Sequence, residues 1–178
     1  MKKTLAVIAG VVVVAVAGLL AYAATKPDTF RVQRSASINA PPEKVFPLIN
    51  DFKSWSAWSP WETKDPGMKR SYGATTSGKG ATYAWDGDSN VGAGNMEITD
   101  APAPSKVRLN LNMTRPMEAR NVVEFTLQPK GNTTEVTWTM NGDVPFVAKV
   151  IHVVFDMDKM VGGEFEAGLA KLKAAAEK

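Results

Sequence analysis

Apolar and polar residues alternate along much of the chain between residues 30 and 140. In residues 30–39 the apolar Val32 and Ile38 fall on one face, and Arg31 and Gln33 fall on the other. This two-residue period predicts a strand with one buried face, and one-sided burial is typical of antiparallel sheets. The same alternation predicts further strands at residues 80–86, 95–100, 106–113, 119–127 and 134–140. Tight turns are predicted at Asp86-Gly87, Lys130-Gly131-Asn132 and Asn141-Gly142.

Helical patterns flank this series of strands. Residues 41–43 (Pro-Pro-Glu) favour a helix start, because proline suits the first turn and an acid suits the N-terminal end of the helix dipole. Pro47 keeps this helix short. After Gly142, apolar residues recur every three to five positions, which predicts one long helix or a short helix followed by a long one.

These elements predict the α+β fold class. The long C-terminal helix has a wide apolar face, which we expect to lie across the concave side of a curved antiparallel sheet. The sheet and the helix then enclose an interior space. Whether that space is filled or hollow is the main functional question.

The N-terminal residues predict a membrane segment. Residues 4–24 carry no charge, and a helix of this length spans about 30 Å, the thickness of a bilayer core. Lys2 and Lys3 favour an N-terminus on the inner side of the membrane, which exports the remainder of the chain. The sequence Ala21-Tyr22-Ala23 fits a signal-peptide cleavage site, but the apolar run over residues 5–20 is long for a cleaved segment and favours an uncleaved anchor.

The predicted division is a transmembrane anchor or signal peptide at 1–24, a short linker at 25–29 and one domain at 30–176. With the anchor retained, the domain is predicted to lie outside the cytoplasm and against the headgroups, because the linker reaches only about 20 Å when extended. With the anchor cleaved, it is secreted.

Composition and charge exclude several classes of function. The 178 residues have a formal net charge of +3, and two of the lysines belong to the leader, so no basic surface for nucleic acid is predicted. The chain has no cysteine and the single histidine His152, which excludes disulfides, thiolate sites and multi-histidine metal sites. No catalytic triad, phosphate loop or metal-ligand cluster is present, so we predict no catalytic residue, metal or cofactor.

Several segments carry a family resemblance. They are residues 38–46 (INAPPEKVF), 48–52 with Trp55, 58–61 (WSPW), 78–85 (GKGATYAW) and the closing helix. In these segments the chain resembles the START-like, polyketide cyclase/dehydrase (SRPBCC) superfamily, in a membrane-anchored bacterial form. The resemblance implies a helix-grip fold, in which the sheet wraps around the terminal helix, and a deep cavity for an apolar ligand between them. It implies no particular chemistry, because this fold hosts several functions.

The candidate ligand-binding residues are large or polar side chains on the faces expected to point inward. They are Arg34, Trp55, Trp58, Tyr83, Trp85, Met96, Asn121, Trp138, Met140, Met157 and Met160. Ordinary core packing is the alternative for each aromatic residue and methionine. Arg34 is predicted to hold a ligand carboxylate or phosphate, to pair with an acid of the protein, or to be turned outward by a bulge. The pair Gly162-Gly163 inside a helix indicates a close approach to the sheet, a kink, room for a ligand or a helix boundary.

The predicted function is binding of a small hydrophobic ligand (a lipid, an isoprenoid or a polyketide-like molecule) by a monomer at the membrane surface. An enzyme of cyclase/dehydratase type is the first alternative, in which Arg34, Asn121 and Tyr83 orient the substrate. A protein-interaction domain with a filled core is the second. Residues 145–155 are apolar on nearly all sides, which predicts a helix that is fully buried or that faces lipid or a partner. Close to a bilayer, this helix is a candidate lid through which a lipid enters.

Overall fold

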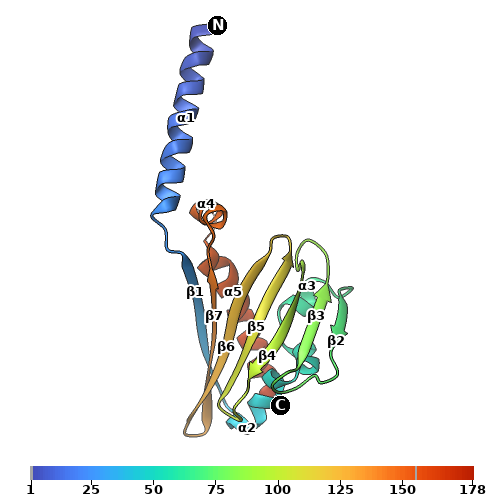
Figure 1. Ribbon diagram of the computed structural model, residues 1–178. Coiled ribbons are helices and arrows are strands. Elements are labelled where there is room, and N and C mark those ends of the chain that lie inside the picture. Colours follow the sequence, from blue (N-terminus) through green and yellow to red (C-terminus); the bar gives the residue numbers. More distant parts are fainter. Residues whose placement is uncertain (1, 155) are drawn as a thin grey trace.

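The computed structural model describes residues 2–154 and 156–178. Figure 1 shows a long isolated helix joined to a domain in which a sheet and helices pack together. The helices are α1 (Lys2–Ala24), α2 (Pro42–Asn50), the 3₁₀ helix η1 (Phe52–Ala57), α3 (Trp61–Lys64), α4 (Phe146–Val154) and α5 (Met157–Ala176). The strands are β1 (Thr29–Ile38), β2 (Lys69–Tyr72), β3 (Thr82–Asp86), β4 (Ala93–Asp100), β5 (Lys106–Arg115), β6 (Ala119–Lys130) and β7 (Thr133–Asp143).

The seven strands form one curved antiparallel sheet in the order β1-β7-β6-β5-β4-β3-β2 (Figure 1). Helix α5 packs across β1, while α2 packs against β5 and β6. We call the face of the sheet toward these helices the inner face and the opposite one the outer face. The predicted α+β helix-grip fold, with its sheet around a long C-terminal helix, is confirmed.

The strand register lines up the apolar positions across the inner face. One row pairs Val32 with Met140, Met140 with Val123, Val123 with Leu109 and Leu109 with Ile98. All five side chains are buried. Alternation along each strand therefore becomes a continuous apolar surface, because the side chains of paired residues point to the same side of a sheet.

The structure differs from the sequence-based prediction at two strands. Strand β2 was not predicted, because its four residues (KRSY) show no apolar alternation and it pairs only with β3 at the sheet edge. The predicted turn at Asn141-Gly142 is wrong. These residues continue β7, because β1 begins at Thr29 and Phe30 pairs with Gly142.

The segment after β7 forms two helices, which was one of the two predicted arrangements. Asp156 begins α5 as its N-cap, with side-chain Oδ1 accepting hydrogen bonds from the backbone N–H groups of Asp158 and Lys159. Gly162 marks a close approach to the sheet, because a Cβ there would overlap the guanidinium of Arg34. Gly163, by contrast, faces open space.

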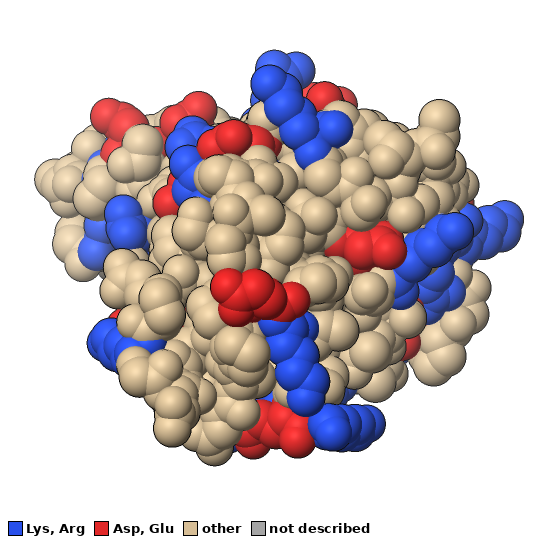
Figure 2. All heavy atoms as spheres, turned by 90° about the horizontal axis from the view of Figure 1, so that it is seen from below, with Lys and Arg blue, Asp and Glu red and all other residues tan. Residues whose placement is uncertain are grey.

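Most of helix α1 extends away from the domain, and only its C-terminal end packs against α4. The α1 segment Val7–Ala24 has a mean hydropathy of 2.6 and is almost entirely exposed. This fits a membrane anchor or a signal sequence. Figure 2 shows the end of the molecule away from α1, where basic and acidic side chains are interspersed.

Candidate functional site

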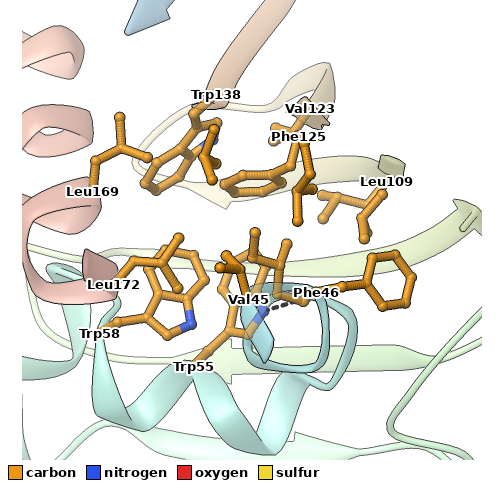
Figure 3. Close-up of a cluster of buried hydrophobic side chains, with 14 of the residues drawn as sticks. Val45, Phe46, Trp55, Trp58, Leu109, Val123, Phe125, Trp138, Leu169 and Leu172 are labelled. Atoms are coloured by element: carbon orange, nitrogen blue, oxygen red, sulfur yellow. Dashed lines mark hydrogen bonds between the residues drawn. The ribbon is translucent and has the colours of Figure 1, made fainter. Parts of the chain in front are cut away.

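The lower half of the inner face, distant from α1, is filled by an aromatic cluster of Trp55, Trp58, Phe125, Trp138 and Phe165. The Trp138 ring stacks on Phe165 with centroids 4.0 Å apart, and it lies 4.8 Å from Phe125 and 5.5 Å from Trp58. Figure 3 shows Trp55, Trp58, Phe125 and Trp138 facing one another, with Leu169 and Leu172 of α5 beside them. Such ring pairs contribute about 0.5–1.5 kcal/mol each beyond their buried area.

This packing shapes what the predicted tryptophans can do. Trp55 and Trp58 each donate an indole N–H to a backbone oxygen of α2, that of Ile49 or Leu48, both at 2.8 Å. The buried Nε1 of Trp138 has no hydrogen-bond partner among the described residues. A ligand inside the aromatic cluster would have to displace rings that already touch. Trp55, Trp58 and Trp138 can therefore form the floor of a site above them more readily than its walls.

The upper half of the inner face, near α1, is packed less completely. One row across the sheet contains Tyr83, Met96, Leu111, Asn121 and Phe30, with Gly142 between the last two. The next row toward α1 pairs Trp85 with Gly94 and Gly94 with Met113. We call the side chains of these two rows, together with Met140, the upper inner face. Phe30, Trp85, Leu111 and Met113 are only partly buried there, although all four are apolar.

The structure thus brings five predicted site residues together on the upper inner face. Tyr83, Met96 and Asn121 share one row, and Trp85 and Met140 lie in the rows on either side. The indole of Trp85 lies over the backbone of Gly94 on the neighbouring strand, where a Cβ would be 2.6 Å from Cη2 of the ring. A side chain at position 94 would therefore force this indole off the sheet.

Asn121 is the polar residue of this surface. The residue is buried, with 9% of its surface exposed. The amide occupies the space above Gly142, where a Cβ would overlap it and would come within 2.7 Å of the Phe30 ring. An amide among apolar side chains is a group that can bind a polar atom of a ligand or a water molecule.

Tyr83 introduces a second polar group at the edge of the same surface. Its ring stacks against Trp85, and its hydroxyl lies 3.4 Å from Oε1 of Glu62, which also binds Arg70 at 2.7 Å. Burial, and next the negative charge of Glu62, raise the pKa of Tyr83 well above the usual range. The hydrogen bond from Arg70 to Glu62 raises the pKa of Arg70. Tyr83 is therefore a neutral phenol that can donate one hydrogen bond.

The remaining predicted residues, Arg34, Met157 and Met160, lie at the start of α5 or face it. Arg34 donates to Glu166 at 2.6 Å and to Asp158 at 2.9 Å, which raises its own pKa and lowers that of Asp158. The predicted alternative of pairing with the protein's own acids is the arrangement observed, so an anionic ligand would have to compete with both carboxylates. Met157 is half-buried and Met160 is 57% exposed.

Two open depressions lie over the strands, and neither borders α5 or the aromatic cluster. The larger has a volume of about 1110 Å³ and crosses β5, β6, β7 and β1. Its lining contains the outer-face row Asn110, Val122, Asn141 and Arg31, and also Phe30, Met113, Asn121 and Gly142. The smaller, of about 360 Å³, lies over β2, β3 and β4. Sequence reasoning did not identify these depressions, because their lining residues come from several strands that only the tertiary structure brings together.

Within the described residues, no group of three or more His, Asp or Glu side chains is placed to hold a metal ion. Phe155, the last residue of the predicted apolar segment, lies outside the described residues, as do the side chains of His152 and Val154.

Solved structures with the same fold share little sequence with this chain. The protein CV1439 from Chromobacterium violaceum is 16% identical, with a TM-score of 0.60, over 85% of this chain and 99% of that one. The Aha1 dimer from Colwellia psychrerythraea is 18% identical, with a TM-score of 0.59, over 83% and 96%. DynU16, from the dynemicin biosynthetic locus, is 14% identical, with a TM-score of 0.59, over 86% of this chain and 48% of that one.

No curated protein compared with this chain matches it. The family model described as polyketide cyclase / dehydrase and lipid transport matches residues 29–177, which include every strand of the sheet and helix α5. The resemblance drawn from the sequence motifs is confirmed by this match. The chain therefore belongs to the polyketide cyclase/dehydrase and lipid transport family.

Proposed function

We propose that this domain binds a small hydrophobic ligand on the upper inner face, between the sheet and the first half of α5. The observation that carries the proposal is a surface of partly buried apolar side chains around the buried polar residue Asn121. The description of the family, which includes lipid transport, supports the same class of ligand. A lipid, an isoprenoid or a polyketide-like molecule fits this chemistry.

The proposed contacts divide into apolar walls and polar anchors. Trp85, Met96 and Met140 would contact the apolar body of the ligand. Trp85 is partly exposed and would lose most of the area, at about 25 cal/mol for each Å², whereas Met96 and Met140 are already buried. Asn121 would bind a carbonyl or hydroxyl of the ligand, and such a single polar group fixes orientation in a largely apolar site. From the sequence prediction, Trp55, Trp58 and Trp138 would supply the floor, and Arg34, Met157 and Met160 the side nearest α5.

We also propose that the protein acts as a monomer at the membrane surface, outside the cytoplasm. Helix α1 and the linker that follows it support this location, since Phe30 of the upper inner face is only six residues beyond Ala24. A ligand that partitions into the bilayer would then have a short path to the site. Secretion after cleavage of α1 is the alternative.

One observation favours the enzyme alternative. The hydroxyl of Tyr83 is backed by Glu62 and Arg70 at the edge of the proposed site. In a cyclase/dehydratase-type reaction, this phenol would turn its hydroxyl from Glu62, its acceptor in the structure, to a substrate carbonyl oxygen and polarise it. Asn121 would hold the other end of the substrate.

A photoreactive fatty acid tests the binding proposal. The full-length protein in lipid nanodiscs is irradiated with a diazirine analogue of palmitic acid, and crosslinked peptides are mapped by mass spectrometry. We expect crosslinks to β3 through β6 on inner-face residues. Leu111→Trp should remove most of them, because a larger side chain would fill this surface.

The matched control is Asn110→Trp, which adds the same ring one residue away on the outer face. It should leave crosslinking unchanged. Crosslinks that persist in Leu111→Trp and disappear in Asn110→Trp would place the ligand in the outer-face depression and contradict the proposal. Thermal melting of both variants verifies that each remains folded.

A further inference from the structure

Helix α4 exposes large apolar side chains at the end of the domain nearest α1. Its nine residues (FVAKVIHVV) contain two polar ones, Lys149 and His152. Phe146 is 48% exposed and Val147 is 69% exposed. Because water is a poor solvent for such side chains, a surface helix that presents them is expected to meet a partner or a lipid phase.

Lys149, the lysine of α4, does not place its charge on this exposed surface. The Lys149 side chain is 8% exposed, and its Nζ lies 2.5 Å from Oδ1 of Asp28 in the linker. The backbone N–H of Val144, just before α4, donates to the backbone oxygen of Asp28 at 2.7 Å. Helix α4 is therefore held beside the linker, with its ammonium turned inward.

The same contacts fix the level of α4 relative to the membrane helix. Helix α4 packs against α1, and Ala23, next to the last residue of α1, is fully buried. Figure 1 shows α4 almost end-on beside the lower end of α1, so that α4 runs across the direction of α1. If α1 crosses a bilayer, α4 then lies close to the plane of its surface.

A tyrosine and a lysine mark where that surface lies. The Nζ of Lys26 donates to the Tyr22 hydroxyl at 2.8 Å and lies 4.4 Å from the centre of its ring. Tyrosine is enriched at the boundary between hydrocarbon and headgroups, and lysine side chains extend toward the headgroups. Both residues lie at the end of α1 that meets α4.

Other exposed apolar residues lie at the same end. Outside α1, the large apolar residues exposed within the described chain are Tyr72, Met117, Phe146, Val147 and Met160. Met117 lies in the turn from β5 to β6 and Met160 in the first turn of α5, both at the end of the sheet from which β7 leads into α4. The opposite end, in Figure 2, carries interspersed charges.

We infer that α4 lies in the bilayer interface as a second membrane contact, with Phe146 and Val147 inserted among the lipids. Short helices with one strongly apolar face bind membranes in this way, parallel to the surface. One transmembrane helix and a linker would leave the domain free to tilt, whereas two contacts fix its orientation and direct the upper end of the sheet toward the lipid. The inference rests on α1 remaining in the bilayer and does not depend on the ligand.

Single-cysteine labelling tests this, because the chain has no native cysteine. The environment-sensitive fluorophore NBD is placed at Val147→Cys in the full-length protein in nanodiscs of phosphatidylcholine and phosphatidylglycerol. Labels at Val13→Cys in α1 and at Asn132→Cys in the distant β6–β7 turn are the references. We expect bromine-labelled lipids to quench the labels at 147 and 13 several-fold more than the label at 132, and aqueous iodide to quench mainly the label at 132.

Each other result overturns the inference. A label at 147 that iodide reaches as readily as the label at 132 shows that α4 faces water. A label at 147 shielded from both quenchers shows that a protein surface covers it. A label at 13 that lipid does not quench shows that α1 is not inserted, while the crosslinking experiment above still reports on the ligand site separately.

A charged variant tests the effect on orientation. The double variant Phe146→Asp/Val147→Asp should widen the distribution of distances between a donor at Asn132→Cys and acceptors in the headgroup plane, because charged side chains leave the interface. Lys44→Glu, an exposed position in α2, changes the net charge by the same amount and should leave the distribution narrow. An unchanged distribution in the double variant contradicts a second membrane contact.

Discussion

At the scale of single residues, the environment of a group is decided by neighbours that are distant in the sequence. The alternation of β3 correctly placed Tyr83 on the inner face, but the partner of its hydroxyl, Glu62, comes from α3. Arg34 likewise meets Asp158 and Glu166, which lie more than 120 residues further along the chain. The residue types could be read from the sequence, whereas their pairing could not, because it depends on where α3 and α5 pack.

Tyr83 gives a prediction for stability at alkaline pH. Its folded pKa is raised above the unfolded value of about 10, so above that pH the unfolded state releases a proton that the folded state retains. The free energy of unfolding should therefore fall as pH rises beyond about 10. We expect Tyr83→Phe to lose less stability than the wild type between pH 9 and pH 11, measured by urea denaturation and circular dichroism.

Tyr72→Phe is the comparison for this titration. Burial also raises the pKa of Tyr72, but this side chain is 37% exposed, so its removal should change the pH dependence less. Equal slopes in the wild type and Tyr83→Phe would show that Tyr83 ionises as freely in the folded protein as in the unfolded chain.

At the scale of elements, α5 is shaped by what packs on it. Gly168 is buried, and a Cβ there would lie 2.8 Å from the Trp138 ring and 3.1 Å from Pro60. Both neighbours are rigid, and Trp138 is fixed by its stacking on Phe165. The sequence indicated helix propensity for this segment, but the position where the helix touches the indole depends on tertiary packing.

Two glycine substitutions in α5 should have opposite effects. Gly168→Ala should destabilise the protein by about 1–3 kcal/mol, because it overpacks the core. Gly163→Ala should stabilise it by about 0.5–1 kcal/mol, since a Cβ there meets open space and alanine favours the helix. Urea denaturation of both variants measures the free energies of unfolding. A loss for Gly163→Ala, or no loss for Gly168→Ala, would be inconsistent with the packing described.

At the scale of the whole molecule, the domain is joined to α1 by more than its linker. The ion pair between Lys149 and Asp28 and the hydrogen bond from Val144 hold α4 beside the end of α1. The ion pair between Lys149 and Asp28 must break before a local opening of α4 can expose the ammonium group of Lys149 to water. The pair therefore controls how firmly α4 is attached.

Removing the carboxylate of Asp28 should loosen the attachment of α4. We expect Asp28→Asn to speed amide hydrogen exchange in residues 146–154 several-fold, which corresponds to the loss of about 1 kcal/mol for a partly exposed ion pair. Hydrogen–deuterium exchange with mass spectrometry, on the protein in nanodiscs, measures the exchange rate of residues 146–154. Asp143→Asn, a nearby exposed acid without an ion pair in the described chain, should leave the exchange unchanged. Equal rates in both variants would show that the ion pair does not hold α4.

The amino-acid sequence by itself determined the elements and their faces. Apolar alternation depends on local side-chain direction, so it placed Tyr83, Met96 and Asn121 on one side of the sheet, and the uncharged run before Thr25 predicted the α1 segment. The motif resemblance gave the fold and the family.

The tertiary structure decided which inward residues fill the core and which remain available. Trp58 and Trp138 point inward like Trp85, yet helix α5 covers the first two and leaves Trp85 partly exposed. It also decided that β7 continues through Gly142 and that α4 packs beside α1. These outcomes depend on the volumes of side chains from distant segments meeting in one place, and no local period contains that information.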